Sequence, residues 1–115
     1  MVKYDWYSYA EVYVPVQALI KKAFYDYDLD CCTVGVHFTD KYTIFKKFKD
    51  MKEKKWHRKS YATIWLTFRK NKQKKKYDLV DFKIKIKPNV PEDLKEVLAK
   101  IENHLKGKLI VKKRR

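Results

Sequence analysis

Lysine and arginine side chains beside aromatic rings are the groups in this chain best suited to bind a ligand. Residues 41–87 carry eighteen Lys or Arg against four acids, whereas residues 1–40 carry three basic and six acidic residues. A clustered positive field of this size attracts a polyanion, and the commonest polyanion in a cell is nucleic acid. The charge distribution therefore predicts RNA or DNA as the partner, bound mainly through its phosphates and without catalysis.

The candidate binding residues lie in three places: residues 46–59, the turn near residues 69–76 and the segment that follows this turn. For phosphate contact they are Lys46, Lys47, Lys54, Lys55, Arg58, Lys59, Arg69, Lys72, Lys74, Lys75, Lys83 and Lys85. The rings of Trp56, Tyr61 and Trp65 are candidates for stacking on the bases of single strands. Each such stack contributes about 1–3 kcal/mol, while neighbouring cations hold the phosphates.

The sheet face that would carry Tyr61 and Trp65 has two interpretations. These residues alternate with apolar ones, so they fall on the face turned away from the core, on a strand that the expected topology places at the sheet edge. Tyr and Trp are also enriched at protein interfaces. The face is therefore either open to nucleic acid or covered by the N-terminal segment or by a second subunit, which would make a homodimer. The positive charge also suits an adaptor or inhibitor that docks on an acidic protein.

One group of acids provides an enzymatic alternative. Asp26, Asp28 and Asp30 alternate and would share one side of an extended segment. Carboxylates grouped in this way can hold Mg²⁺ for phosphodiester cleavage. A small metal-dependent nuclease is thus the alternative to a binding protein, and a polar loop at a helix end is the alternative to both.

No other catalytic or metal-binding pattern is evident in the sequence. Two adjacent cysteines, Cys31 and Cys32, and three scattered histidines lack the spacing of a metal site, and two glycines cannot form a phosphate-binding loop. We therefore expect no catalytic residue, no metal and no cofactor. The cysteine usage indicates a reducing cytoplasm, and no apolar stretch approaches the ~20 residues that cross a bilayer, so no membrane partner is expected.

The clearest structural elements are two strands that flank a basic turn. Apolar residues alternate with other residues from Ala62 to Phe68, and the same period of two resumes over residues 80–87. The two segments are close in sequence, so they are expected to pair antiparallel around a turn at residues 70–76. A winged-helix DNA reader with this hairpin as its wing is a weaker alternative.

The remaining segments predict an α+β domain. Four apolar residues between Ile44 and Met51 fall at helical spacing, so a helix is expected at about residues 41–56. A second helix follows Pro91, and strands are expected at residues 31–38 and 109–111. Across residues 31–112 the order is thus βαββαβ, the ferredoxin-like order, with helices on one face of a mainly antiparallel sheet.

The length of the chain predicts a single domain, residues 1–115. Its parts would be an N-terminal strand–helix unit (1–30), a sheet–helix core (31–111) and a basic tail (112–115). In the first unit, residues 4–14 are expected to be extended and Pro15 to open a helix.

Overall fold

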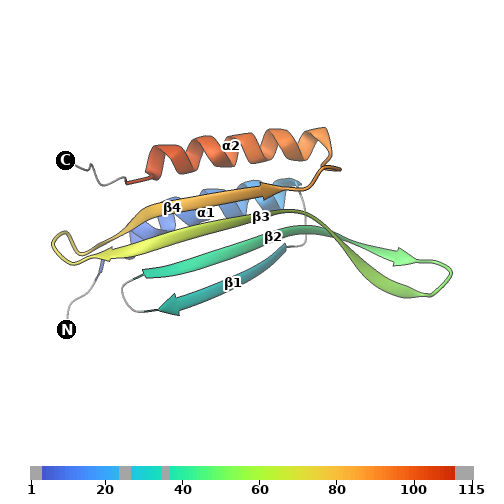
Figure 1. The fold of residues 1–115 in the computed structure, drawn as a ribbon, viewed down its shortest axis with the longest axis horizontal. Helices are drawn as coiled ribbons and strands as arrows, with labels where there is room; N and C mark the ends of the chain where they lie inside the picture. The colour runs from blue at the N-terminus through green and yellow to red at the C-terminus, as the bar shows by residue number, and fades with distance from the viewer. Residues whose placement is uncertain (1–3, 24–26, 35–36, 111–115) are drawn as a thin grey trace.

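The computed structural model describes residues 4–23, 27–34 and 37–110, with side chains described outside residues 23–37. A four-stranded antiparallel sheet of order β1-β2-β3-β4 lies between two helices in the sequence, and each strand pairs with the next (Figure 1). The elements are α1 (Trp6–Ala23), β1 (Tyr27–Val34), β2 (His37–Asp50), β3 (Lys55–Asn71), β4 (Lys76–Ile86) and α2 (Glu92–Lys108).

Both helices pack on one face of this sheet and share one hydrophobic core with it. The alternating apolar residues of β3 point toward the helices, and every second residue from Ala62 to Phe68 is buried. α1 and α2 contribute residues three or four positions apart, which fall on one helical face. These are Val12, Val16, Ile20, Leu94, Leu98, Ile101 and Leu105. The prediction of an α+β fold with helices on one side of an antiparallel sheet is confirmed.

The predicted hairpin over residues 61–87 is also confirmed. β3 and β4 pair antiparallel, with Trp65 opposite Lys83 and Thr63 opposite Lys85. A bulge between Thr67 and Phe68 shifts the register near the turn. Period-two alternation identified these strands because one face of β3 is buried, and in β4 the half-buried Phe82 and Ile84 alternate with the exposed Lys83 and Lys85.

The predicted helix at residues 41–56 is wrong, because this segment forms most of β2, a turn and the start of β3. Asp40, Tyr42 and Ile44 are all buried on the helix-facing side, so the segment follows a strand period. Phe48 and Met51, which suggested a helical stripe, are 49% and 80% exposed. As a strand, residues 41–50 pair their backbone with β3, and that pairing decides the outcome.

The ferredoxin-like order is therefore wrong, and the order is αββββα. The strand expected at residues 31–38 is divided between the end of β1 and the start of β2. Of the strand expected at residues 109–111, Leu109 forms a single parallel bridge with Leu79. Residue 111 and the basic tail at 112–115 lie outside the described residues.

The predicted N-terminal strand–helix unit is wrong as well, because α1 already begins at Trp6. The Asp5 carboxylate accepts a hydrogen bond from the Tyr7 amide at 3.0 Å, which caps the helix. Pro15 lies inside α1 and does not open it. A proline inside a helix costs about 3 kcal/mol, but burying each large aliphatic side chain of this face contributes about 1.5–3 kcal/mol. Burial of the helix face outweighs the proline.

Both ends of the described chain return to β4. The Asp5 amide donates to the Lys75 carbonyl at 2.7 Å, and the Ile110 amide donates to the Leu79 carbonyl at 2.8 Å. These contacts cover part of an edge strand that would otherwise present unpaired backbone groups. Among the described residues, neither helix is long and apolar enough to span a membrane.

Candidate nucleic-acid interface

Positive charge is divided unequally between the two layers of the molecule. Residues 37–86, which contain β2, β3, β4 and their turns, hold seventeen Lys or Arg against five acids, and β1 adds two acids and no basic residue. α1 and α2 together hold six lysines and five acids. Three lysines of α2 also pair with acids, at 3.2 Å (Lys95–Glu92), 3.1 Å (Lys106–Glu102) and 3.5 Å (Lys108–Glu11). The strands and turns, and not the helices, therefore generate the positive field of the described structure.

The sheet face opposite the helices carries a row of cations around a central ring. Trp65 lies on β3 between Lys41 of β2 and Lys83 of β4. The expectation that Trp65 occupies an edge strand is wrong, because β3 is flanked by strands on both sides. α1 packs against the other face, so the N-terminal helix does not cover this one. We call this surface the open face, since no described element lies over it.

Two of the predicted stacking rings are already occupied by lysines. The Lys83 ammonium lies 5.5 Å from the centroid of the Trp65 ring, and the Lys59 ammonium lies 5.7 Å from that of Tyr61. Both rings are half-buried, so a base could stack on them only after displacing the ammonium. By contrast, Trp56 is 67% exposed. The geometry thus favours phosphate contact on the open face and leaves Trp56 as the accessible stacking ring.

β2 and β3 extend beyond their neighbours as a two-stranded arm, residues 45–60. β1 pairs with β2 only as far as Ile44, and β4 pairs with β3 only as far as Ala62, so the six following residue pairs are formed by β2 and β3 alone (Figure 1). The arm holds eight Lys or Arg and two acids. Its cations include Lys46, Lys47, Lys54, Lys55, Arg58 and Lys59, all predicted as binding residues.

A pocket of about 320 Å³ lies where the arm joins the sheet. Three cations line it, Arg58, Lys59 and Lys87, together with the Tyr61 ring and the polar side chains of Ser60 and Asn89. Cations and hydrogen-bond donors around one hollow can hold a phosphate group. Lys87 was absent from the predicted set; it is brought to the pocket by β4, whose end is tied to β3 by a 2.9 Å bond from the Lys87 amide to the Tyr61 carbonyl.

The turn between β3 and β4 carries the third group of predicted residues, Lys72, Lys74 and Lys75. Asn71 organises this turn, because its side-chain oxygen accepts hydrogen bonds from the Gln73 and Lys74 amides, both at 3.1 Å. The arm turn is built in the same way, with Asp50 in place of Asn71 and bonds to the Lys52 and Glu53 amides at 2.8 and 3.3 Å. Each turn ends in a lysine with positive φ, Lys54 (54°) and Lys75 (53°).

These groups do not converge into one compact patch. The two turns lie at opposite ends of the long axis of the molecule, whose largest extent is 58 Å (Figure 1). Between them lie the pocket and the open face with Lys41, Lys83 and Lys85. The predicted cations are thus distributed along the long axis of the molecule, and those of the arm, the pocket, the open face and the β3–β4 turn are together called the basic band.

Arg69 and Lys41 each differ from the predicted set of binding residues: Arg69 is paired with an acid, and Lys41 was not predicted. Arg69, a predicted binding residue, lies 3.8 Å from the buried Asp78 carboxylate, which also accepts a bond from the Asn71 amide group at 3.0 Å, so Arg69 helps to neutralise a buried charge. Lys41, on the open face, was missed because its segment was expected to be helical. The alternation of Asp40, Tyr42 and Ile44 was the signal that could have identified it.

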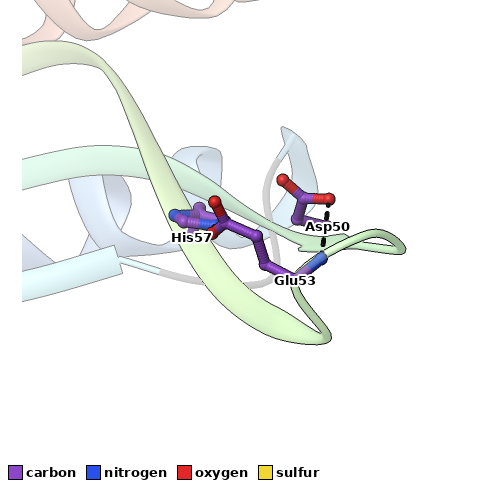
Figure 2. A group of neighbouring side chains, drawn as sticks. All are labelled: Asp50, Glu53 and His57. Carbon is purple, nitrogen blue, oxygen red and sulfur yellow. Dashed lines mark hydrogen bonds and ion pairs between the residues drawn. The ribbon is translucent and has the colours of Figure 1, made fainter.

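The arm turn also brings together three side chains of metal-ligating type, Asp50, Glu53 and His57 (Figure 2). Their ligand atoms lie within 4.8 Å of one another, and His57 Nε2 is 3.4 Å from Glu53 Oε2. However, Asp50 organises the turn, and Asn71, a weaker metal ligand, does the same work in the other turn. Lysines surround the group on both strands, and their charge opposes cation binding. We assign these residues to the turn.

The acids on which the nuclease alternative depends lie largely outside the described residues. Asp26 and the side chains of Asp28 and Asp30 lie outside the described part of the structure. Asp40, the acid nearest to them in β2, is 1% exposed and accepts a hydrogen bond from the Tyr9 hydroxyl on the helix side of the sheet. Asp40 therefore cannot reach a polyanion bound on the open face.

Comparisons of this chain with protein-family models, with curated proteins and with solved structures each find no match. Its function must therefore be inferred from charge and geometry.

Proposed function

We propose that this protein binds nucleic acid without catalysis, mainly through phosphate contacts along the basic band. The observation that supports this proposal is the division of charge between the layers: seventeen basic residues against seven acids in the sheet and its turns, β1 included, and near balance on the helices. A fold needs no such excess for solubility, and like charges crowded on one layer repel one another in the folded state. A polyanion along the band would supply the missing countercharge.

The test is the salt dependence of binding, measured by fluorescence anisotropy with labelled single- and double-stranded RNA and DNA. If the band neutralises ~6–10 phosphates, affinity should fall by about 10³–10⁵ between 50 and 200 mM salt. Replacing Lys83 and Lys85 of the open face with Gln should weaken binding and lower the salt slope by about 1.8. The matched control replaces Lys95 and Lys106 of α2, which removes the same charge from the helix layer.

Equal losses from the open-face pair and the α2 pair would show that only net charge matters, and flat affinity across the salt range would refute the proposal. The same samples also test the two rival activities, nuclease cleavage and binding to an acidic protein. Cleavage of the labelled strands with Mg²⁺ or Mn²⁺ would indicate a nuclease, with Asp28→Ala and Asp30→Ala as controls. An acidic protein partner that stays bound after nuclease treatment would indicate an adaptor or inhibitor.

Two further parts of the proposal concern the context of binding. We propose the cytoplasm as the location, because adjacent Cys31 and Cys32 provide no disulfide framework. A homodimer in which a second copy covers the open face remains an alternative arrangement, and sedimentation with and without nucleic acid distinguishes it from a free monomer.

A further inference from the structure

The pocket where the arm joins the sheet has a positive lining that no described acid balances. Its charged residues are Arg58, Lys59 and Lys87, and none of its lining residues is a carboxylate. The pocket between β4 and α2 is lined instead by one lysine and one acid, and the pocket beside the start of α2 by three lysines and two acids. Of these three pockets, the one at the arm is therefore best suited to hold an anion.

Contacts within the protein position these cations. The Arg58 guanidinium lies 4.9 Å from the centroid of the Phe45 ring and makes further contacts within the protein, so its main contribution to the pocket is its charge. The Lys59 ammonium lies 5.7 Å from the centroid of the Tyr61 ring. Lys87 is tied to β3 through its backbone amide, which leaves its side chain out of that bond. Lys59 and Lys87 are therefore the two cations that we assign to a ligand.

The charge and the donors of the pocket match a phosphate monoester. A monoester carries a charge of about −1.5 to −2 near pH 7 and has three strong acceptor oxygens, whereas each phosphodiester inside a strand carries one charge. Two ammonium groups balance the charge of the monoester. The Ser60 hydroxyl and the Asn89 amide group, which also line the pocket, can donate hydrogen bonds to the remaining oxygens. The lining thus suits the end of a strand better than its interior.

The size of the pocket leads to the same ligand. Its volume of about 320 Å³ equals that of about ten water molecules at about 30 Å³ each, which is more than a phosphate group alone fills. A phosphate together with its sugar fits, and the Tyr61 and Pro88 rings of the lining offer apolar surface to that sugar. An internal phosphate is joined to a sugar on both sides and passes across a surface, whereas a terminal phosphate enters a hollow end-on.

We propose that this pocket holds the terminal phosphate of a nucleic-acid strand, with the Lys59 and Lys87 ammonium groups donating to its oxygens. This inference rests on the proposed nucleic-acid binding and names the feature of the ligand that the pocket recognises. Lys83, Lys85 and Lys87 occupy alternate positions at the end of β4, so they fall on one face of the sheet. A strand that ends in the pocket can therefore continue along the open face, where these lysines meet its internal phosphates.

The experiment measures the affinity of the full-length chain for a short single strand of fixed sequence, made as DNA and as RNA and labelled at one end. The other end carries a 5′-phosphate, a 3′-phosphate, a hydroxyl group or a phosphate capped as its methyl ester. At one of the two ends, the phosphate should raise the affinity about tenfold over the hydroxyl, because one net charge-assisted hydrogen bond contributes that much. The methyl cap should remove most of this gain, since it leaves a single charge.

Variants of the same chain assign the gain to the pocket. Lys59→Gln and Lys87→Gln should each reduce the gain from the terminal phosphate to about threefold or less. Lys85→Gln is the matched control, because it removes the same charge from β4 outside the pocket lining. It should weaken binding of all the oligonucleotides together and keep the tenfold gain. The gain is a ratio within each variant, so a general loss of charge cancels, and circular dichroism verifies that every variant is folded.

The outcomes separate the two proposals. If the wild-type chain binds none of the oligonucleotides, the proposed function fails and this inference fails with it. If it binds, but the free phosphate end gains nothing over the capped one, only the pocket inference fails. The same holds if Lys85→Gln lowers the gain as much as Lys87→Gln. Deoxyadenosine monophosphate should bind far more weakly than the phosphorylated strand, because it makes no contact with the open face. Equal affinity would assign the pocket to free nucleotides and overturn the proposal.

Discussion

The two lysines with positive φ allow stability and binding to be separated by single substitutions. Lys54 and Lys75 are the only non-glycine residues with positive φ in the described ranges, and each closes a turn of the same design. The left-handed conformation costs an L-residue about 1–2 kcal/mol. Glycine avoids this cost but loses about 0.5–1 kcal/mol more backbone entropy on folding. Lys75→Gly should therefore stabilise the fold by about 0.5–1 kcal/mol, although it removes a positive charge from the basic band.

The two turns lie at opposite ends of the molecule, so the effects should add in the double variant with Lys54→Gly, to about 1–2 kcal/mol. Urea denaturation followed by circular dichroism measures the free energy of unfolding. For a chain of this size, 1 kcal/mol corresponds to a rise of about 4 °C in Tm. In parallel, the salt slope of nucleic-acid binding should fall by about 0.9 for each lysine that contacts a phosphate.

Lys72→Gly is the matched control, because it removes the same charge from the same turn at a residue whose φ is not positive. There glycine only adds entropy to the unfolded chain, so this variant should lose about 0.5–1 kcal/mol. If Lys75→Gly proves no more stable than Lys72→Gly, the assignment of backbone strain to Lys75 is wrong. If both variants are as expected in stability but bind nucleic acid with the wild-type salt slope, this turn does not contact phosphate.

Further substitutions test the turn, the buried carboxylate, the core and the open face. Asp50→Ala should destabilise the protein by about 1 kcal/mol in urea unfolding, whereas Asp50→Asn should be nearly neutral, because an amide oxygen still accepts the turn hydrogen bonds. Tyr9→Phe should cost about 1–3 kcal/mol, because it removes the hydroxyl that donates to the buried Asp40 carboxylate; a loss below 0.5 kcal/mol would contradict this role. Ile64→Ala should cost about 2–5 kcal/mol, since its side chain is fully buried between the layers. Trp65→Ala should weaken single-strand and duplex binding about equally, because Lys83 already covers the ring; a selective loss for single strands would favour base stacking.

Several features of this protein follow from the sequence alone. The excess of positive charge in residues 41–87, the alternation along β3 and β4 and the apolar stripe of α2 all depend on neighbours a few positions away. Short-range periodicity is sufficient for such elements because each has one face that is more buried than the other. The α+β class and the antiparallel hairpin were predictable for that reason.

Other features depend on contacts between distant segments. Residues 41–50 have apolar residues that satisfy both a helical and a strand period, and only pairing with β1 and β3 decides between them. Similarly, α1 continues through Pro15 because Val12, Val16 and Ile20 pack against the sheet and against α2. In both segments the local preference is weak, and long-range burial and hydrogen bonding outweigh it.

The sequence by itself determined that the middle of the chain is strongly basic, and that the lysines of residues 83–87 alternate with the apolar residues of a strand. Only the tertiary structure decided where those cations lie. Because β2 and β3 are longer than their neighbours, the charges are spread along the long axis of the molecule, on the sheet and on the arm, and do not gather at one site. Strand length and register set that arrangement, and both result from pairing between residues that are far apart in the chain.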